Sequence, residues 1–202
     1  MPRIAGPIDL AKTEANLDAT AAAIFEKGLA VSVDEIARRA GVSKQTVYNH
    51  YGSKPELVRA LIQRRTDQIT APLDVQGADA HPEETLADYA RLLLETISMP
   101  RGLAIFRLII ASVGSDPEIG QAAFRSGARA SRIKLTEFLA REAAAGRLAV
   151  EDPAEAADFF AGMVVSHRQL TGLLGLPLDL DAAHIDRIAT EAARRFMRAY
   201  AP

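Results

Sequence analysis

The stretch that decides the fold is VSVDEIARRAGVSKQTVYNHYGSK, residues 31–54. Its pattern predicts two short helices joined by a tight turn. Ser32 and Glu35 have the spacing of a capping box, which predicts a helix that begins near Val33. Gly41 ends that helix, because glycine enters the left-handed backbone conformation at little steric cost. Ser43 then caps a second helix, from Lys44 to His50.

The second of these helices turns Val47 inward and presents a polar face. The side chains that point outward are those of Lys44, Gln45, Thr46, Tyr48, Asn49 and His50. All of them can donate a hydrogen bond, and none is acidic. A helix with such a face fits the major groove of B-DNA, which is about 12 Å wide. Glutamine and asparagine suit adenine edges and lysine suits guanine, whereas tyrosine, threonine and histidine more often reach phosphates.

A third helix begins with the sequence SKPE, residues 53–56, which is another capping box with proline in the first turn. The first turn of a helix has free backbone donors and a partial positive charge. With Lys54 beside it, this helix end is predicted to bind a DNA phosphate.

Residues 20–64 resemble the DNA-binding domain of the TetR/AcrR family of bacterial transcriptional regulators. The pieces that carry the resemblance are AIF at 23–25 with Gly28, IARRAGVSK at 36–44, TVYNHY at 46–51 and SKPEL at 53–57. The family often has phenylalanine where this chain has Tyr51, and a small residue or proline where it has Gln45. Gln45 is therefore a candidate determinant of operator specificity. The alternative for this stretch is a helix-turn-helix used only for packing.

Composition and charge set the bounds on the whole chain. Its 202 residues are 49% hydrophobic and 25% charged, which is ordinary for a globular protein with a full core. The absence of cysteine excludes a disulfide scaffold and a thiolate zinc site, and fits the reducing cytoplasm. No signal peptide or membrane-spanning run is expected. Residues 1–65 carry a balance of +3 and residues 66–202 a balance of −5, as expected when only one end meets DNA.

The hydrophobic pattern predicts an all-α protein of about nine helices. A three-helix DNA-binding domain is expected over residues 1–53, and a regulatory and dimerisation domain over 54–202, with the helix from residue 54 as connector. Pro72 is expected to end that connector, and the apolar helix from Gly102 to Val113 to be buried all round. The expected helices span residues 9–27, 33–40, 44–50, 54–71, 82–98, 102–113, 117–146 with a bend near Gly127, 153–174 and 182–200.

The second half of the chain resembles the AefR-like branch of TetR/AcrR regulatory domains. The matching pieces are FRLIIA at 106–111, DPEI at 116–119, LAR at 139–141, GRL at 146–148 and DP at 152–153. The resemblance implies a homodimer formed by the last two helices. The apolar residues expected at that interface are Phe159, Phe160, Val164, Leu170, Ile185, Ile188 and Phe196. Their alternative role is in the ordinary core of a single chain.

The resemblance also implies a pocket for a small hydrophobic effector in the body. Its expected lining is Leu93, Ile97, Phe106, Ile110, Met163 and His167, although a filled core is the alternative for each of these residues. A lone histidine such as His167 is more often a satisfied core or interface residue. In the implied mechanism, the effector shifts the helix from residue 54 and releases a repressor from operator DNA.

Two other classes of protein compete with a regulator. An enzyme is disfavoured, since the sequence has no nucleophile elbow, no phosphate-binding glycine loop and no metal-binding histidine pair. Neither a cofactor nor a metal is therefore expected. The remaining rival is a helical protein–protein adaptor that kept the motif but lost DNA binding.

Overall fold

The computed structural model describes residues 17, 21–24, 26, 31–75 and 81–202, and it leaves the side chains of His50 and Lys54 undescribed. The described part contains helices and no strand, so the predicted all-α class is confirmed. The expected first helix and the residues before it lie mostly outside the described part, although residues 21–24 and 26 are helical. In chain order the elements are α2 Val33–Ala40, α3 Lys44–Tyr51, α4 Lys54–Asp74, α5 Pro82–Ser98, α6 Pro100–Ser112, α7 Pro117–Phe124, a π-helical turn Arg125–Arg129, α8 Ala130–Ala144, α9 Pro153–Val165, α10 Arg168–Leu173 and α11 Ala182–Ala199.

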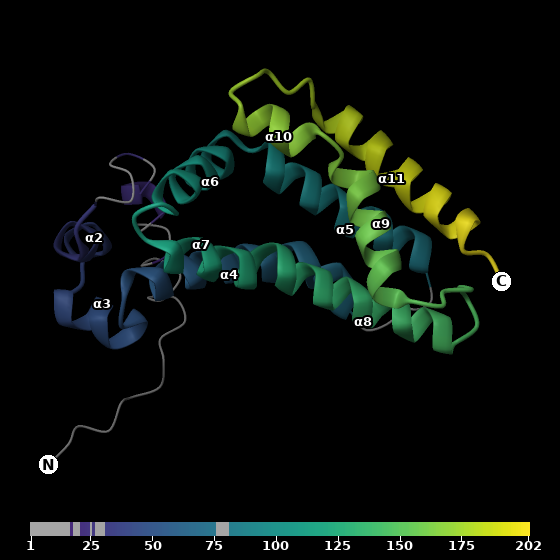
Figure 1. Cartoon of the computed structure of the whole chain (residues 1–202), viewed down its shortest axis with the longest axis horizontal. Coiled ribbons are helices and arrows are strands. Elements are labelled where there is room, and N and C mark those ends of the chain that lie inside the picture. The colour runs from purple at the N-terminus through teal and green to yellow at the C-terminus, as the bar shows by residue number, and fades with distance from the viewer. Residues whose placement is uncertain (1–16, 18–20, 25, 27–30, 76–80) are drawn as a thin grey trace, which may run out of the picture.

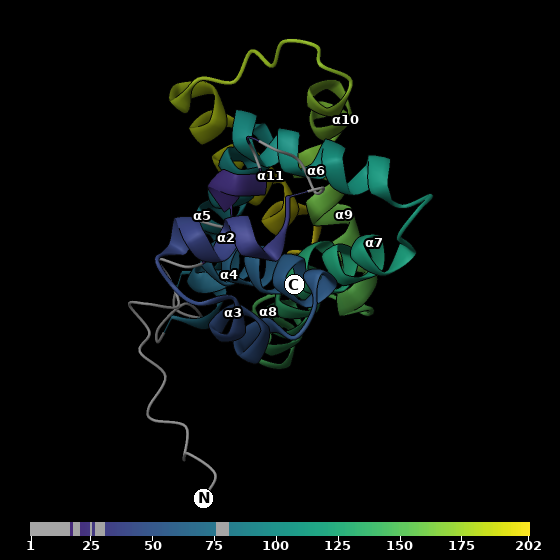
Figure 2. The same cartoon turned by 90° about the vertical axis from the view of Figure 1, so that its left-hand side faces the viewer.

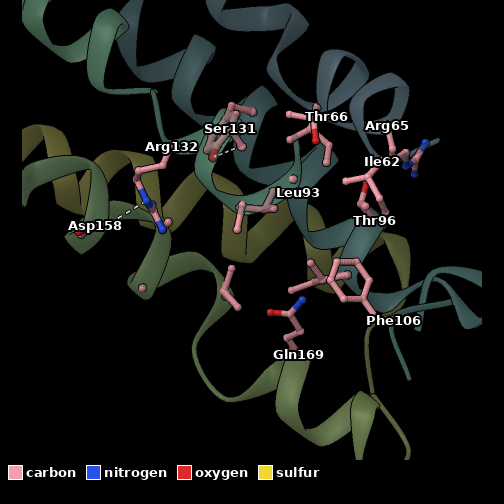
Figure 3. Close-up of a pocket in the computed structure, with 18 of the residues that line it drawn as sticks. Ile62, Arg65, Thr66, Leu93, Thr96, Phe106, Ser131, Arg132, Asp158 and Gln169 are labelled. Atoms are coloured by element: carbon pink, nitrogen blue, oxygen red, sulfur yellow. Dashed lines mark hydrogen bonds and ion pairs between the residues drawn. The ribbon is translucent and has the colours of Figure 1, made fainter. Parts of the chain in front are cut away.

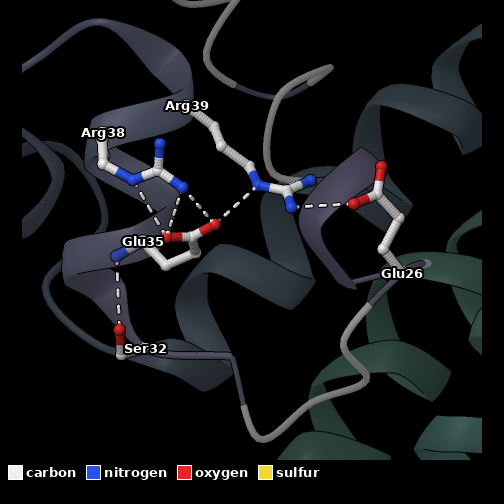
Figure 4. Close-up of polar contacts among 5 residues, drawn as sticks. All are labelled: Glu26, Ser32, Glu35, Arg38 and Arg39. Carbon is white, nitrogen blue, oxygen red and sulfur yellow. Dashed lines mark hydrogen bonds and ion pairs between the residues drawn. The ribbon is translucent and has the colours of Figure 1, made fainter.

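The two helices of the deciding stretch form as predicted. The backbone N–H of Glu35 donates to Ser32 Oγ over 3.2 Å, and Gly41 ends α2 at a φ of 66°. The carboxylate of Glu35 pairs with Arg38 and Arg39 (Figure 4). Arg39 also reaches Glu26, with 2.7 Å between Nη2 and Oε2, and so ties α2 to the helical residues before it.

Helix α4 is longer than the sequence predicts. Pro72 lies inside it, and the helix ends only at Asp74, where Val75 turns extended. Proline has no N–H group, so at this position it removes one backbone hydrogen bond of the last turn but does not end the helix. The prediction that Pro72 ends the helix is therefore wrong. The helix runs from the head, which is the described part of residues 17–53, along the length of the body, while the C-terminus lies at the far end (Figure 1).

Two hydrophobic clusters hold the molecule together. The larger one lies in the body and includes Tyr89, Phe138, Phe160 and Phe196. The smaller one contains head residues such as Ile24 and Ile36, but it also takes residues from three body helices: Leu57 and Val58 of α4, Ile109 of α6, and Ile119 and Ala123 of α7. Because this cluster combines residues of both parts, the head packs directly onto α6 and α7. The predicted boundary after residue 53 would divide the cluster.

Helix α6 is not buried all round, contrary to the prediction. Leu103 and Ile109 are buried, whereas Ile110 is 56% exposed and Val113 44% exposed. One face of α6 packs on the head cluster and on α10, which leaves apolar side chains of the other face on the surface of a single chain.

Two helix irregularities lie in the body. The predicted bend at Gly127 is confirmed, because this residue has φ −98° and ψ −105° inside the π-helical turn. A Cβ there would lie 3.0 Å from Ile62 Cγ2 on α4, so glycine permits this close packing. The second irregularity divides the expected 153–174 helix into α9 and α10 at Ser166, whose φ of 47° is the one positive value at a non-glycine residue within the described ranges.

Candidate nucleic-acid interface and ligand cavity

Helix α3 has the predicted division between a buried and an exposed side. Val47 is 5% exposed and packs inward, while Tyr48 is 42% exposed. Lys44, Gln45 and Asn49 are exposed and Thr46 is partly buried. In the view from the head end, α2 and α3 lie in front of the body helices, so no described part of the protomer covers α3 from that side (Figure 2). His50 and Lys54 occupy helical backbone positions, but their side chains fall outside the described set.

The polar side chains of α3 are already ordered by local contacts. Gln45 Nε2 donates to Asn49 Oδ1 over 2.7 Å, so the two amides form one unit on the surface. Lys44 Nζ lies 2.9 Å from Asp34 Oδ2 of α2, and the hydrogen bond that Lys44 donates to this carboxylate is the main reason that the pKa of Lys44 is raised. On DNA, Lys44 would exchange this exposed ion pair for a base edge or a phosphate.

The start of α4 has the geometry expected of a phosphate site. Ser53 Oγ accepts the N–H of Glu56 over 3.3 Å, and Pro55 lies in the first turn. Gly52 connects α3 to this turn at a φ of 66° and brings the first residues of α4 directly after the recognition helix. The N-terminus of α4, which is the positive end of its dipole, therefore lies only a few residues after the end of α3.

The body contains a cavity of about 340 Å³. It lies between α4, α5, α6, the π-helical turn, α8, α9 and α10 (Figure 3). Leu93, Ile97 and Phe106, three of the residues predicted to contact an effector, line this cavity. Most of the surface is apolar, and polar groups come from Thr66, Tyr89, Thr96, Ser131, Ser166 and Gln169.

The other residues predicted to line the pocket lie elsewhere. Ile110 is 56% exposed on α6 and Met163 is 41% exposed on α9. Helix α9 turns Ala161, Gly162 and Val165 toward the cavity, which leaves Met163 on another side. His167 is exposed after the break at Ser166, and its Nδ1 lies 3.3 Å from Ser166 Oγ. The sequence could not locate that break, because no glycine or proline marks it.

Charged and polar groups in the cavity wall are unevenly paired. Tyr89 Oη lies 2.9 Å from Ser131 Oγ, and burial raises the pKa of Tyr89. Arg132 pairs with Asp158 at 2.7 Å between Nε and Oδ1. Arg65 on α4 instead donates to Gln68 Oε1 over 2.9 Å and to Met99 Sδ over 3.3 Å. Sequence reasoning missed all of these polar lining residues, since single polar residues on helices give no signal of a shared cavity.

The expected dimer residues fall into two groups. Phe160, Val164, Ile185 and Phe196 are at most 6% exposed and belong to the core of their own chain. Ile188 is partly buried against the same cluster. Only Phe159, at 56%, and Leu170, at 59%, are exposed. The alternative of an intramolecular core therefore holds for most of the set, because α11 buries its apolar stripe on α5 and turns charged residues outward.

An exposed polar helix after a tight turn, carried on a helical body with an internal cavity, defines a helix-turn-helix regulator. The chain belongs to the TetR family of bacterial regulatory proteins: the tetR-family domain matches residues 17–61, and the C-terminal domain of AefR-like transcriptional repressors matches residues 84–202. Both resemblances seen in the sequence are thereby confirmed. The first matched segment extends into α4 and residues 62–83 lie between the two matches, so the predicted boundary at residue 53 remains a prediction.

Relatives of known structure cover nearly the whole chain. The Flavonoid-responsive Regulator FrrA is 32% identical, with a TM-score of 0.71 over 95% of this chain and 98% of that one. A TetR-family regulator from Mesorhizobium loti MAFF303099 has a TM-score of 0.76 over 98% of this chain and 100% of that one, and at 24% identity it shows the fold alone.

Among curated proteins, the transcriptional repressor KstR2 of Mycobacterium tuberculosis is 35% identical over 88 residues, 43% of this chain and 44% of that protein. The chain thus spans less than half the length of the curated relatives it matches. Within the described ranges, no cluster of three or more histidine or acidic residues could hold a metal ion, and no helix has the length and apolarity to cross a membrane.

Proposed function

We propose that this protein is a homodimeric transcriptional repressor that binds operator DNA through α3 and is released by a small, mainly apolar molecule in the body cavity. The observation that carries the DNA-binding part is the outward face of α3, which is polar, free of acids and uncovered at the end of the molecule. A role as a repressor has support from the match to the C-terminal domain of AefR-like transcriptional repressors and from KstR2, which is named a transcriptional repressor. Since operator DNA lies in the bacterial cytoplasm, the proposal implies that location.

Binding to a library of genomic fragments across a salt series tests the DNA-binding part. The affinity should fall steeply as salt rises, because Lys and Arg contacts to phosphate release counterions. A Tyr48→Ala variant should weaken binding to all fragments. If the wild-type protein selects no fragment at low salt, the helical adaptor is the better reading, and a regulator that binds DNA is excluded.

The effector part of the proposal has support from the cavity and from one relative. An apolar cavity of about 340 Å³ with a few polar groups suits a drug-sized molecule. FrrA is described as responsive to flavonoids, which are compact aromatic molecules of that kind. A ligand can release DNA only if it binds the DNA-free arrangement more tightly, by about 1–3 kcal/mol in the usual range of coupling.

To test release, operator affinity is measured without and with a saturating ligand found by thermal-shift screening. An unchanged dissociation constant would reject the switch. The same screen on a Phe106→Trp variant, which fills the cavity, serves as a control and should lose the ligand while retaining operator binding.

The homodimer part of the proposal has support from exposed apolar side chains on α9 and α10. Phe159 and Met163 are 56% and 41% exposed, one turn apart on α9, and Leu170 and Leu174 follow on and after α10 at 59% and 68%. Single chains seldom expose large apolar side chains in such numbers on neighbouring elements. A two-fold dimer would present two α3 helices at the spacing of one DNA turn, about 34–36 Å.

A further inference from the structure

Arg65 stands at the meeting point of two cavities. The cavity described above and a second one of about 420 Å³ share four wall residues, Ile62, Arg65, Thr96 and Phe106. The second cavity reaches Ala21 of the head and Met99 and Gly102 at the corner between α5 and α6. Arg65 lies at the edge of the body cavity (Figure 3) and also lines the chamber that borders the head.

The contacts of Arg65 leave its charge uncompensated. Its guanidinium donates to a neutral amide oxygen and to a thioether sulfur, and it forms no ion pair with any carboxylate in the described part of the chain. A guanidinium remains charged at all ordinary pH values and offers five N–H donors in one plane. A cation of this kind, partly buried in the wall that the two cavities share, favours a bound anion.

Arg132 in the same cavity provides the contrast. Its Nε lies 2.7 Å from Asp158 Oδ1, and its Nη1 also donates to the carbonyl of Ala157. The wall near Arg132 is thus neutral. The charge pattern sets a direction in the cavity: the acidic end of a ligand is favoured at Arg65 and gains no net attraction near Arg132.

We infer that the ligand of this cavity is an amphipathic carboxylate, whose acid group binds Arg65 and whose apolar body fills the chamber lined by Ile69, Leu93, Ile97 and Val165. This inference rests on the proposed function for the existence of an effector, and it adds the chemical class. One carboxylate matches one uncompensated guanidinium through two parallel hydrogen bonds, whereas a doubly charged phosphate would need a second cation.

The position of Arg65 also relates ligand binding to the head. Arg65 is on α4, the helix whose first turns supply Leu57 and Val58 to the head cluster. An acid group bound to Arg65 would lie beside the second cavity, which Ala21 of the head also lines. The ligand would therefore contact the connector helix itself and occupy the space between this helix and the corner of α5 and α6.

The test compares matched probes on matched variants of the full-length protein. The probes are straight-chain alkanoates of six to twelve carbons and the primary amides of the same lengths, and binding is measured by isothermal titration calorimetry at low salt. The variants are Arg65→Gln and Arg132→Gln. Both substitutions remove one arginine from the cavity wall, but only Arg65 lacks a carboxylate partner.

In the wild type we expect at least one alkanoate to bind about tenfold more tightly than its amide. Arg65→Gln should abolish that difference, and Arg132→Gln should retain it. An Arg65→Lys variant, which keeps the charge without the planar fork, should retain part of the difference and guards against a folding defect in Arg65→Gln.

The inference is overturned if no alkanoate binds, if acid and amide bind equally, or if the preference survives in both variants at position 65. Operator binding without any probe is measured on the same samples. If the wild type does not bind any operator, the proposed function is contradicted. If it binds the operator but binds acid and amide equally, only the assignment of a carboxylate is contradicted.

Discussion

Gln45 and Tyr48 lie on one exposed helix but offer DNA different chemistry. The Gln45 amide is held by Asn49 at 2.7 Å and can read an adenine edge, while the Tyr48 hydroxyl suits a phosphate. We expect Gln45→Ala to relax the preference at one operator position by about 1–3 kcal/mol. Tyr48→Phe should weaken binding to all operator sequences alike. Competition binding against operators randomised one position at a time measures both effects, and a uniform loss with Gln45→Ala would contradict base reading.

The turn between α2 and α3 depends on the backbone of Gly41. Its φ is 66°, and a Cβ added there would meet nothing within 4 Å. The expected loss of stability with Gly41→Ala is therefore purely conformational, about 1–2 kcal/mol for an L-residue in the left-handed region. Gly114→Ala is the matched control, since Gly114 also has open space but no positive φ. Urea unfolding of both variants should show a loss only at position 41.

Tyr89 should make stability depend on alkaline pH. Burial raises its pKa in the folded state above the unfolded value of about 10. Below the unfolded pKa both states keep the proton; above it the unfolded chain loses the proton first, so stability falls as pH rises toward the folded pKa. The slope is about 1.4 kcal/mol per pH unit in that window. Urea midpoints of wild type and Tyr89→Phe between pH 9 and 11 isolate this contribution, which should be absent from the variant.

Helix α6 joins the head to the body through one face only. Ile109 is 4% exposed within the head cluster, whereas the next residue, Ile110, is 56% exposed. Ile109→Ala should destabilise the protein by about 2–4 kcal/mol, because it leaves a cavity in a packed core. Ile110→Ala should change stability by less than about 0.5 kcal/mol in the monomeric chain. Thermal unfolding distinguishes them, and equal effects would show that the head does not rely on α6.

The elements that the sequence predicted well are those with local signals. Ser32, Ser43 and Ser53 accept backbone N–H groups at the helix starts where they were expected, and Asp152 and Asp181 do so at the starts of the helices predicted from residues 153 and 182. The errors arose where tertiary packing decides. Pro72 is accommodated in a last turn, α6 exposes one apolar face, and the chain breaks at Ser166 because α10 packs on α5 and α6. The polar cavity residues share no sequence pattern, since they come from five separate helices and from Ser166 between α9 and α10.

At the scale of the molecule, the head cluster and the cavity share one connector. Helix α4 contributes Leu57 and Val58 to the head cluster and Ile62, Arg65, Thr66 and Ile69 to the cavity wall. Arg107 of α6 adds a second link, because its guanidinium donates to the carbonyls of Gly172 and Leu173 at the end of α10. A ligand that changes the position of α4 or α10 would therefore displace helices that pack directly on the head.

Dimerisation is a property of the whole molecule, and the exposed side chains of Phe159 and Met163 on α9 make it testable. A Phe159→Asp/Met163→Asp double variant should be monomeric in analytical ultracentrifugation, because two charges would enter an apolar interface. Its stability should be retained, since both side chains are exposed in the single chain. Operator affinity should fall, because each half-site is then bound independently instead of by a linked pair. Ile110→Asp, an equally exposed apolar position on α6, is the control and should leave the dimer intact. If the double variant stays dimeric while Ile110→Asp dissociates, the two-fold contact lies on α6, and the spacing of the α3 helices must be derived from that face.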